Sequence, residues 1–209
     1  MVSYRSLRGE TVTEKVIEKS RFITTSRHVS CEEEACAFIA EISAKYRDAT
    51  HNCHAYIYDR VGNFPRFSDD GEPQGTAGMP ILEVIKNKKL FETAVVVTRY
   101  FGGIKLGAGG LVRAYSSCTA ENLDAAEKVL YENCSENSYT VAYTDVDSAM
   151  RLFAETGASV LSADYSNEVI FIVAVKKSEE EDLNKALLNR LCGRVKIRKI
   201  KEYFYPFDV

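Results

Sequence analysis

The chain has 209 residues, 45% of them hydrophobic and 27% charged, with a formal net charge of −3 at pH 7. This composition is typical of a globular protein with one large domain or two small ones, and it excludes a global electrostatic attraction to nucleic acid, so any such binding requires a local basic patch. There is no apolar run of membrane-spanning length, no signal-peptide core in the first ten residues and no C-x-x-C pair among the six cysteines, which together favour a cytoplasmic protein with reduced thiols.

Strands and helices are expected to alternate in the first half of the chain. The pattern predicts strands at residues 11–16, 22–29, 51–58 and 94–100, and helices after residue 30, at residues 80–85 and at residues 109–128. Ser30-x-x-Glu33 is a capping-box pattern at the start of the first helix. The strand at 94–100 is the clearest, because β-branched valines dominate a short run closed by a Gly-Gly pair.

The second half follows a different order of elements. Strands are predicted at residues 138–143, 159–165, 169–175 and 194–204, with helices that start at Thr144 and Ser178 and end at Gly157 and Gly193. The order β-α-β-β-α-β is that of a ferredoxin-like unit. We therefore predict an α+β protein with two domains, residues 1–136 and 137–209, divided in the polar stretch near Glu136.

Glycine is concentrated between residues 71 and 110, where eight of the twelve glycines lie. A buried strand there leads into a glycine-rich turn, and the turn leads into a helix that carries basic residues. Free N–H groups at a helix N-terminus favour an anion, and Arg99, Lys105 and Arg113 would add positive charge. The candidate anion- or nucleic-acid-binding residues are Arg99, Gly102, Gly103, Lys105, Gly107, Gly109, Gly110 and Arg113. The alternative is that these glycines only permit close packing of the helix on the strand.

Two other polar motifs carry potential chemistry. Asp69, Asp70 and Glu72 could bind a divalent metal or act as acid and base. The alternative is an ordinary turn, because Asp-Gly-Glu-Pro is a common turn sequence and the spacing does not match a calcium-binding loop. His51 and His54 project to opposite faces of a strand, which leaves too few ligands on one face for zinc. A packing role is expected for the histidines, and no metal or other cofactor is assigned.

A secondary basic patch is expected near the C-terminus. Its residues are Arg194, Lys196, Arg198, Lys199 and Lys201, and two aromatic residues, Tyr203 and Phe204, follow. Basic residues interleaved with aromatics on a sheet can track an RNA backbone and stack bases. The alternative is a solvated edge strand whose lysines prevent aggregation.

The glycine-rich segment resembles the YigZ/IMPACT family. The positions that match its signature are Gly78, Ile81, Leu82, Ile85, Leu90, Val96, Val97, Arg99, Tyr100, Phe101, Gly102, Gly103, Leu106 and Gly107. The flanking segments 51–53, 68–73 and 109–115 are also similar to this family, so the resemblance covers most of residues 15 to 125. The second half resembles the small C-terminal domain of the bacterial members.

The resemblance implies an N-terminal β-α-β-α domain like the second domain of a small-subunit ribosomal protein, and a C-terminal domain like the last domain of elongation factor G. Eukaryotic IMPACT proteins regulate translation by competing for the activator of an amino-acid-starvation kinase. Their extra N-terminal domain has no counterpart in this sequence, so that kinase-pathway role is not carried over. The resemblance brings no established reaction with it, and likeness of fold alone does not assign one.

Three hypotheses about function follow. The preferred one is a non-enzymatic translation-related regulator that binds RNA, the ribosome or a translation-associated protein, with no membrane partner. The second is an enzyme for an anionic or phosphorylated small molecule, with Asp69, Asp70 or Glu72 as metal ligand or base. The third is a protein-binding module that uses Tyr100 and Phe101 as anchors.

Overall fold

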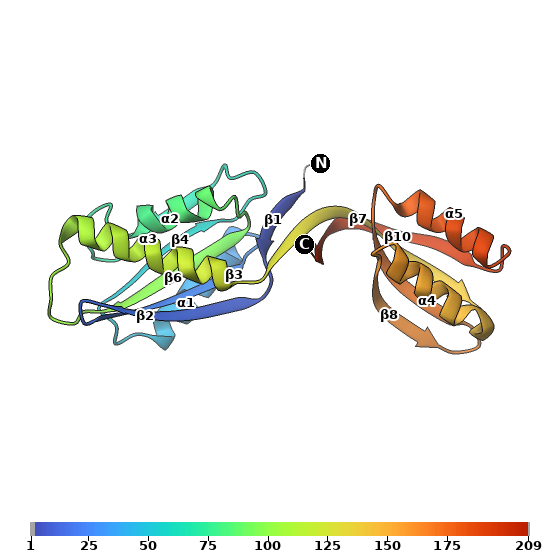
Figure 1. Ribbon diagram of the computed structural model, residues 1–209, viewed down its shortest axis with the longest axis horizontal. Helices are drawn as coiled ribbons and strands as arrows, with labels where there is room; N and C mark the ends of the chain where they lie inside the picture. The colour runs from blue at the N-terminus through green and yellow to red at the C-terminus, as the bar shows by residue number, and fades with distance from the viewer. Residues whose placement is uncertain (1–2, 209) are drawn as a thin grey trace. The chain divides into compact units, whose positions relative to one another are not determined.

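The computed structural model describes residues 3–208, and the chain divides into two compact units, residues 4–129 and 130–207 (Figure 1). Both units combine helices with a sheet, so the predicted two-domain α+β class is confirmed. Residues 1, 2 and 209, the ends of the two predicted domains, lie outside the described residues.

The first unit contains a five-stranded antiparallel sheet in the order β2-β3-β6-β4-β5. Its elements are β1 (Tyr4–Leu7), β2 (Glu10–Ile17), β3 (Ser20–His28), α1 (Glu32–Lys45), β4 (His51–Ile57), β5 (Pro65–Ser68), α2 (Gly78–Asn87), β6 (Thr93–Tyr100) and α3 (Gly107–Ala125). The predicted strands and helices of this half are present. The strand β5 was not predicted, because its four residues show no apolar alternation.

The central strand β6 is buried on both faces, which explains its nearly continuous apolar sequence. Val95 and Val97 point to a core that is closed by α2 and α3, whereas Ala94 and Val96 point to a second core under α1. The helices α2 and α3 lie side by side over the first of these cores (Figure 1). The side chains alternate because successive residues of a strand face opposite sides.

The capping-box prediction at α1 was wrong in its partner residue. Both the backbone N–H and the hydroxyl of Ser30 donate to Glu34 Oε2, at 2.7 and 2.8 Å, and Glu33 takes no part in this contact. The helix begins at Glu32, with Cys31 as the residue before it. The Glu34 carboxylate, one residue beyond the predicted Glu33, therefore accepts the hydrogen bonds from Ser30 at the start of α1.

The second unit has the ferredoxin-like order of elements. It contains β7 (Lys128–Val141), a 3₁₀ turn η1 (Tyr143–Asp145), α4 (Val146–Glu155), β8 (Ser159–Tyr165), β9 (Val169–Lys176), α5 (Glu180–Arg190) and β10 (Lys196–Asp208). Strand β7 lies between β10 and β9, and β8 pairs with the other edge of β9. This is the strand arrangement of the split βαβ fold. The core contains Tyr139, Phe153, Phe171 and, from α5, Leu183 and Leu187.

The predicted domain boundary near Glu136 falls inside β7, and the two compact units divide instead between Val129 and Leu130. The polar stretch around residue 136 forms a strand in which buried side chains donate hydrogen bonds to Glu180. Ser135 Oγ donates to Glu180 Oε2 at 2.7 Å, and Asn137 Nδ2 donates to Glu180 Oε1 at 3.1 Å. The polar residues of this stretch therefore belong to a buried strand that is hydrogen-bonded to α5 and do not mark a linker.

Candidate anion and nucleic-acid interface

The glycine-rich turn between β6 and α3 is fixed at its start by the turn between β2 and β3. A Cβ added to Gly102 would lie 2.0 Å from the carbonyl oxygen of Lys19, so only glycine fits at this position. The Gly102 N–H donates to Ser20 Oγ at 3.2 Å, and the Phe101 N–H donates to Thr50 Oγ1 at 3.0 Å. Close packing therefore explains this glycine.

The first turn of α3 contains three glycines with different constraints. Gly107 has a φ of +68°, which side chains rarely adopt, and a Cβ on Gly110 would lie 3.0 Å from Leu106 Cβ. Gly109 has neither constraint, since its nearest neighbour would be Arg113 Nη1 at 3.6 Å, an ordinary contact. Packing against the described residues therefore does not account for Gly109.

The N-terminus of α3 has no side-chain cap within the described residues, so its free N–H groups are open to an anion. The helix is 19 residues long, which gives it a full macrodipole. The predicted anion-binding geometry of the backbone is thus available at this helix start.

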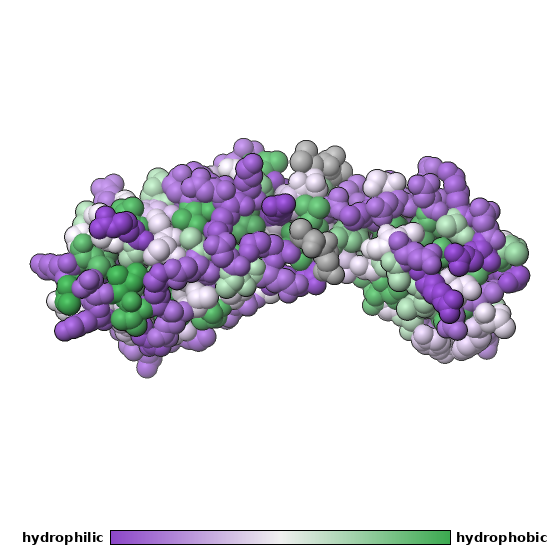
Figure 2. All heavy atoms as spheres, in the orientation of Figure 1, coloured by the Kyte–Doolittle hydropathy of each residue, from purple (hydrophilic) through white to green (hydrophobic). Residues whose placement is uncertain are grey.

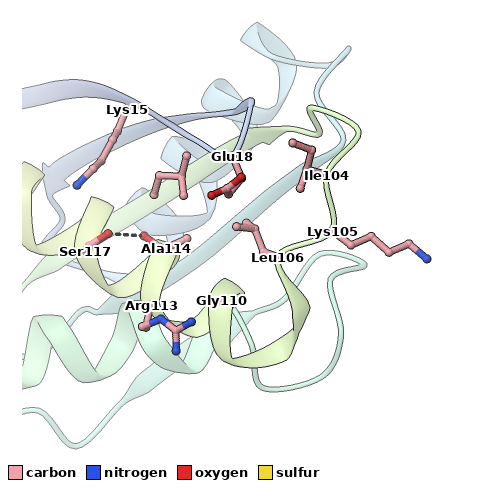
Figure 3. A pocket seen from close by; sticks show the side chains of 10 residues that line it. Lys15, Glu18, Ile104, Lys105, Leu106, Gly110, Arg113, Ala114 and Ser117 are labelled. Carbon is pink, nitrogen blue, oxygen red and sulfur yellow. Dashed lines mark hydrogen bonds between the residues drawn. The ribbon is translucent and has the colours of Figure 1, made fainter.

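The three predicted cations do not converge on that N-terminus. Arg99 is only 4% exposed and donates from Nη1 to Glu72 Oε1 at 2.6 Å. Lys105 and Arg113 are exposed, and Figure 3 shows their side chains pointing in different directions. The three residues therefore do not form a single clamp. The reason is the alternation of β6, which puts Arg99 on the same inward face as Val95 and Val97.

Arg99 belongs to a buried polar network that sequence reasoning did not identify. Its Nη2 donates to Ser20 Oγ at 3.2 Å, and Tyr115 donates its hydroxyl proton to Glu72 Oε1 at 2.9 Å. The Nε atom of Arg99 has no hydrogen-bond partner in the part of the chain that the structure describes. The inward position of Arg99 was the signal in the sequence, because a buried guanidinium requires a carboxylate.

Cys53 extends this network and is unsuited to nucleophilic chemistry. Its single S–H lies within hydrogen-bond distance of two acceptors, the Asp69 carbonyl oxygen at 3.0 Å and Tyr115 Oη at 3.3 Å. Burial raises the pKa of the Cys53 thiol to about 12, and burial also raises the pKa of Tyr115. Since the thiolate is the reactive form of cysteine, Cys53 is a structural residue.

The acidic loop is bonded to the chain itself. Asp69 accepts backbone N–H groups from Gly75, Ala77 and Gly78 at 2.8, 3.0 and 2.8 Å. Burial acts to raise the pKa of Asp69, but these three hydrogen bonds outweigh it and lower the pKa. Asp70 Oδ2 accepts the Asn52 N–H at 2.5 Å. Within residues 3–208 no group of three or more His, Cys, Asp or Glu side chains is arranged to hold a metal.

Two cavities flank the turn before α3. One, of about 370 Å³, is bounded by Glu72, Pro73, Arg99, Phe101, Lys105, Leu106, Gly107, Ala108 and Leu111. The other, of about 610 Å³, lies on the side of Lys15, Ile104, Gly110 and Arg113 and is drawn in Figure 3. Lys105 and Leu106 border both cavities. The turn before α3 therefore separates the two cavities, with Lys105 and Leu106 forming part of the wall of each.

Apolar side chains are exposed at this turn and on α3. Phe101 is 46% exposed, and Ile104 and Val112 are 37% and 38% exposed. Figure 2 shows hydrophobic side chains gathered at the end of the first unit where the β2–β3 turn and the loop before α3 lie. We call Phe101, Ile104, Lys105, Gly109 and Arg113 together the α3 surface. In the described chain, Lys105 and Arg113 have no ion-pair partner.

The predicted C-terminal basic patch is largely neutralised. Four of its five residues form ion pairs: Arg194 with Asp145 at 2.9 Å, Lys196 with Glu168 at 2.9 Å, Lys199 with Glu202, and Lys201 with Glu136 at 3.4 Å. Only Arg198 has no ion-pair partner within residues 3–207. The local field of this strand is consequently weaker than its sequence suggests.

An α/β unit with a basic glycine turn, followed by a ferredoxin-like unit, defines a two-domain α+β protein with a candidate anion site on its first domain. The Impact N-terminal domain matches residues 18–123, and the domain of unknown function DUF1949 matches residues 140–194. The chain belongs to the IMPACT family.

Relatives and a solved structure agree with this assignment. The chain is 38% identical to the IMPACT family member YvyE of Bacillus subtilis, over 94% of this chain and 91% of the relative. It is 32% identical to YigZ of Escherichia coli, over 92% and 95% of the two chains. A crystal structure of a hypothetical protein is similar at 30% identity, with a TM-score of 0.61 and coverage of 96% and 98%. No helix among the described residues is long and apolar enough to cross a membrane.

Proposed function

We propose that this protein is a non-enzymatic, cytoplasmic, translation-related regulator that binds RNA, free or within the ribosome, through the α3 surface. The observation that carries the proposal is the exposed Phe101 ring together with Lys105 and Arg113, which have no ion-pair partner among the described residues and flank the uncapped start of α3 on different sides. Six free cysteines are compatible with a reducing compartment.

Each part of the α3 surface has a role in such a complex. Lys105 and Arg113 contact phosphates, and the amides at the start of α3 add further donors. Phe101 offers a ring on which an unpaired base stacks, a contact worth about 1–3 kcal/mol per base. The net charge of the chain is −3, so the protein as a whole does not attract RNA. The electrostatic attraction for RNA phosphates must come from the local cations of the α3 surface.

The same geometry supports binding rather than catalysis. The carboxylates that an enzymatic mechanism would use are engaged by backbone N–H groups or by Arg99, and the Cys53 thiol is protonated near neutral pH. The relatives from Saccharomyces cerevisiae and Dictyostelium discoideum are both named protein IMPACT homologs, and each aligns with 47% of this chain. The translation-related part of the proposal comes from this family membership.

Filter binding of single-stranded RNA at increasing salt tests the proposal. We expect retention at low ionic strength, and a fall of log K with log salt whose slope is about −0.7 per phosphate contacted. Lys105→Ala and Arg113→Ala should each make this slope shallower by about one phosphate contact. Absence of binding by the wild-type chain at low ionic strength would refute the proposed function.

A further inference from the structure

The geometry points to the 370 Å³ cavity beside the α3 surface as a subsite for one unstacked nucleobase of the bound RNA. This inference rests on the proposed function and adds to it a place where a single base is held. The evidence consists of the cavity's walls, the polar groups at its floor and the helix start at its mouth.

The walls of the cavity suit a flat apolar ligand. Pro73, Phe101, Leu106 and Leu111 supply apolar surface, and Ala108 contributes a small side chain to the lining. The volume lies within the range of about 300–1,000 Å³ that is common for small-ligand sites. An aromatic base inserted there would contact the Phe101 ring, which is otherwise 46% exposed.

A guanidinium and a carboxylate stand next to each other in the lining of the cavity. The side chains of Arg99 and Glu72 are only 5% and 4% exposed, and both line the cavity. Glu72 Oε2 has only His51 Nε2 within ion-pair range among the described residues, at 3.9 Å, whereas Arg99 Nε is itself buried. Guanine and uracil carry a carbonyl oxygen beside an N–H group, which matches a guanidinium beside a carboxylate.

The mouth of the cavity favours the phosphate of the same nucleotide. Gly107 and Lys105 line the cavity, and the N–H groups of the first turn of α3 have no side-chain cap. Gly109, which does not itself line the cavity, lies two residues after Gly107, and no contact among the described residues requires glycine there. A phosphate that approaches the backbone closely supplies a reason for it, because a Cβ would narrow the approach.

A cavity-filling substitution separates this subsite from the rest of the α3 surface. Ala108→Trp fills the cavity from an exposed position, so the fold should be retained. Val112→Trp is the matched control, because Val112 is exposed on the same helix and does not line this cavity. Circular dichroism and thermal melting of both variants verify that the first unit remains folded.

The measurement is the affinity of the full chain for a single-stranded RNA and for an abasic oligonucleotide of equal length and charge. We expect the wild type and Val112→Trp to prefer the RNA with bases by roughly tenfold, in line with one stacked and hydrogen-bonded base. Ala108→Trp should lose that preference and keep its affinity for the abasic strand.

The outcomes distinguish the subsite from the proposed function. If the wild type binds both strands equally well, the subsite is refuted while RNA binding stands, and the cavity then serves another occupant, such as an aromatic side chain of a protein partner. A preference that persists in Ala108→Trp also refutes the subsite. If the wild type binds neither strand, the proposed function fails and the subsite fails with it.

Discussion

Arg99 Nη1 lies 2.6 Å from Glu72 Oε1, and both side chains are at least 95% buried. This ion pair joins the central strand β6 to the acidic loop before α2. Arg99 of the glycine-rich segment and Glu72 of the acidic loop, two separate motifs in the sequence, therefore contact each other in the structure. Because Arg99 and Glu72 are buried and paired with each other, only Lys105, Arg113 and the start of α3 remain to attract an external anion.

Removing the charge of Glu72 should destabilise the first unit strongly. In Glu72→Gln the Arg99 guanidinium stays buried without a counter-charge, which typically costs about 3–5 kcal/mol. Urea unfolding monitored by circular dichroism measures the loss. Glu83→Gln is the control, since Glu83 pairs with Lys86 at an exposed position and should change stability by less than about 1 kcal/mol. Equal effects of the two substitutions would contradict the buried pair.

Asp69→Ala should lower stability, because Asp69 accepts three backbone N–H groups at the start of α2. Loss of a helix N-terminal cap costs about 0.5–2 kcal/mol, and burial of the freed amides places this site at the upper end. Thermal melting with and without magnesium provides the measurement. Unchanged stability together with a magnesium-dependent shift in the wild type alone would instead support a metal role for Asp69.

Two glycine substitutions should act in opposite directions. Gly102→Ala brings a Cβ against the Lys19 carbonyl and should cost about 1–3 kcal/mol through forced backbone movement. Gly109→Ala meets no close neighbour and should stabilise α3 by about 0.5–1 kcal/mol, while it weakens RNA binding. Chemical denaturation of both variants, and filter binding of Gly109→Ala, test the pair. A Gly109→Ala variant with tighter RNA binding would contradict close approach at this residue.

The second unit should lose stability in acid through Glu180. Burial acts to raise its pKa, but hydrogen bonds from Lys177, Ser135 and Asn137 outweigh burial and lower the pKa from 4.5 to about 2. A carboxylate with a depressed pKa contributes its full stability above pH 4.5, and this contribution is lost as the pH falls toward 2. Glu180→Gln should therefore flatten the stability profile between pH 4.5 and 2. An unchanged profile in unfolding experiments would contradict the low pKa.

Much of the fold was predictable because periodicity and turn residues are local signals. The valines of β6 and the βαββαβ order of the second half were predicted on this basis. The boundary predicted near Glu136 falls within β7, where Ser135 and Asn137 donate to Glu180, a partner more than forty residues away. The three-cation clamp failed for a similar reason. Strand alternation placed Arg99 inward, but its pairing with Glu72 depends on how a loop folds back.

The C-terminal basic patch illustrates the same limit. A list of basic residues does not reveal their acidic neighbours in space, and four of those five side chains are paired. Conversely, the glycine turn could be located from sequence alone, whereas the cavity beneath Phe101 depends on the packing of α3 against the acidic loop. Positions along the chain were therefore more predictable than the contacts between them.

Comparison of two charge-reversal variants tests the role of the α3 surface most directly. One variant carries Lys105→Glu and Arg113→Glu, and the control carries Lys196→Glu and Lys201→Glu in the paired strand β10. Single-stranded RNA binding at low ionic strength is the measurement. We predict that the first variant loses at least tenfold in affinity and that the control stays within about threefold of the wild type. Loss of binding in the control, with wild-type affinity retained by the α3 variant, would contradict the account.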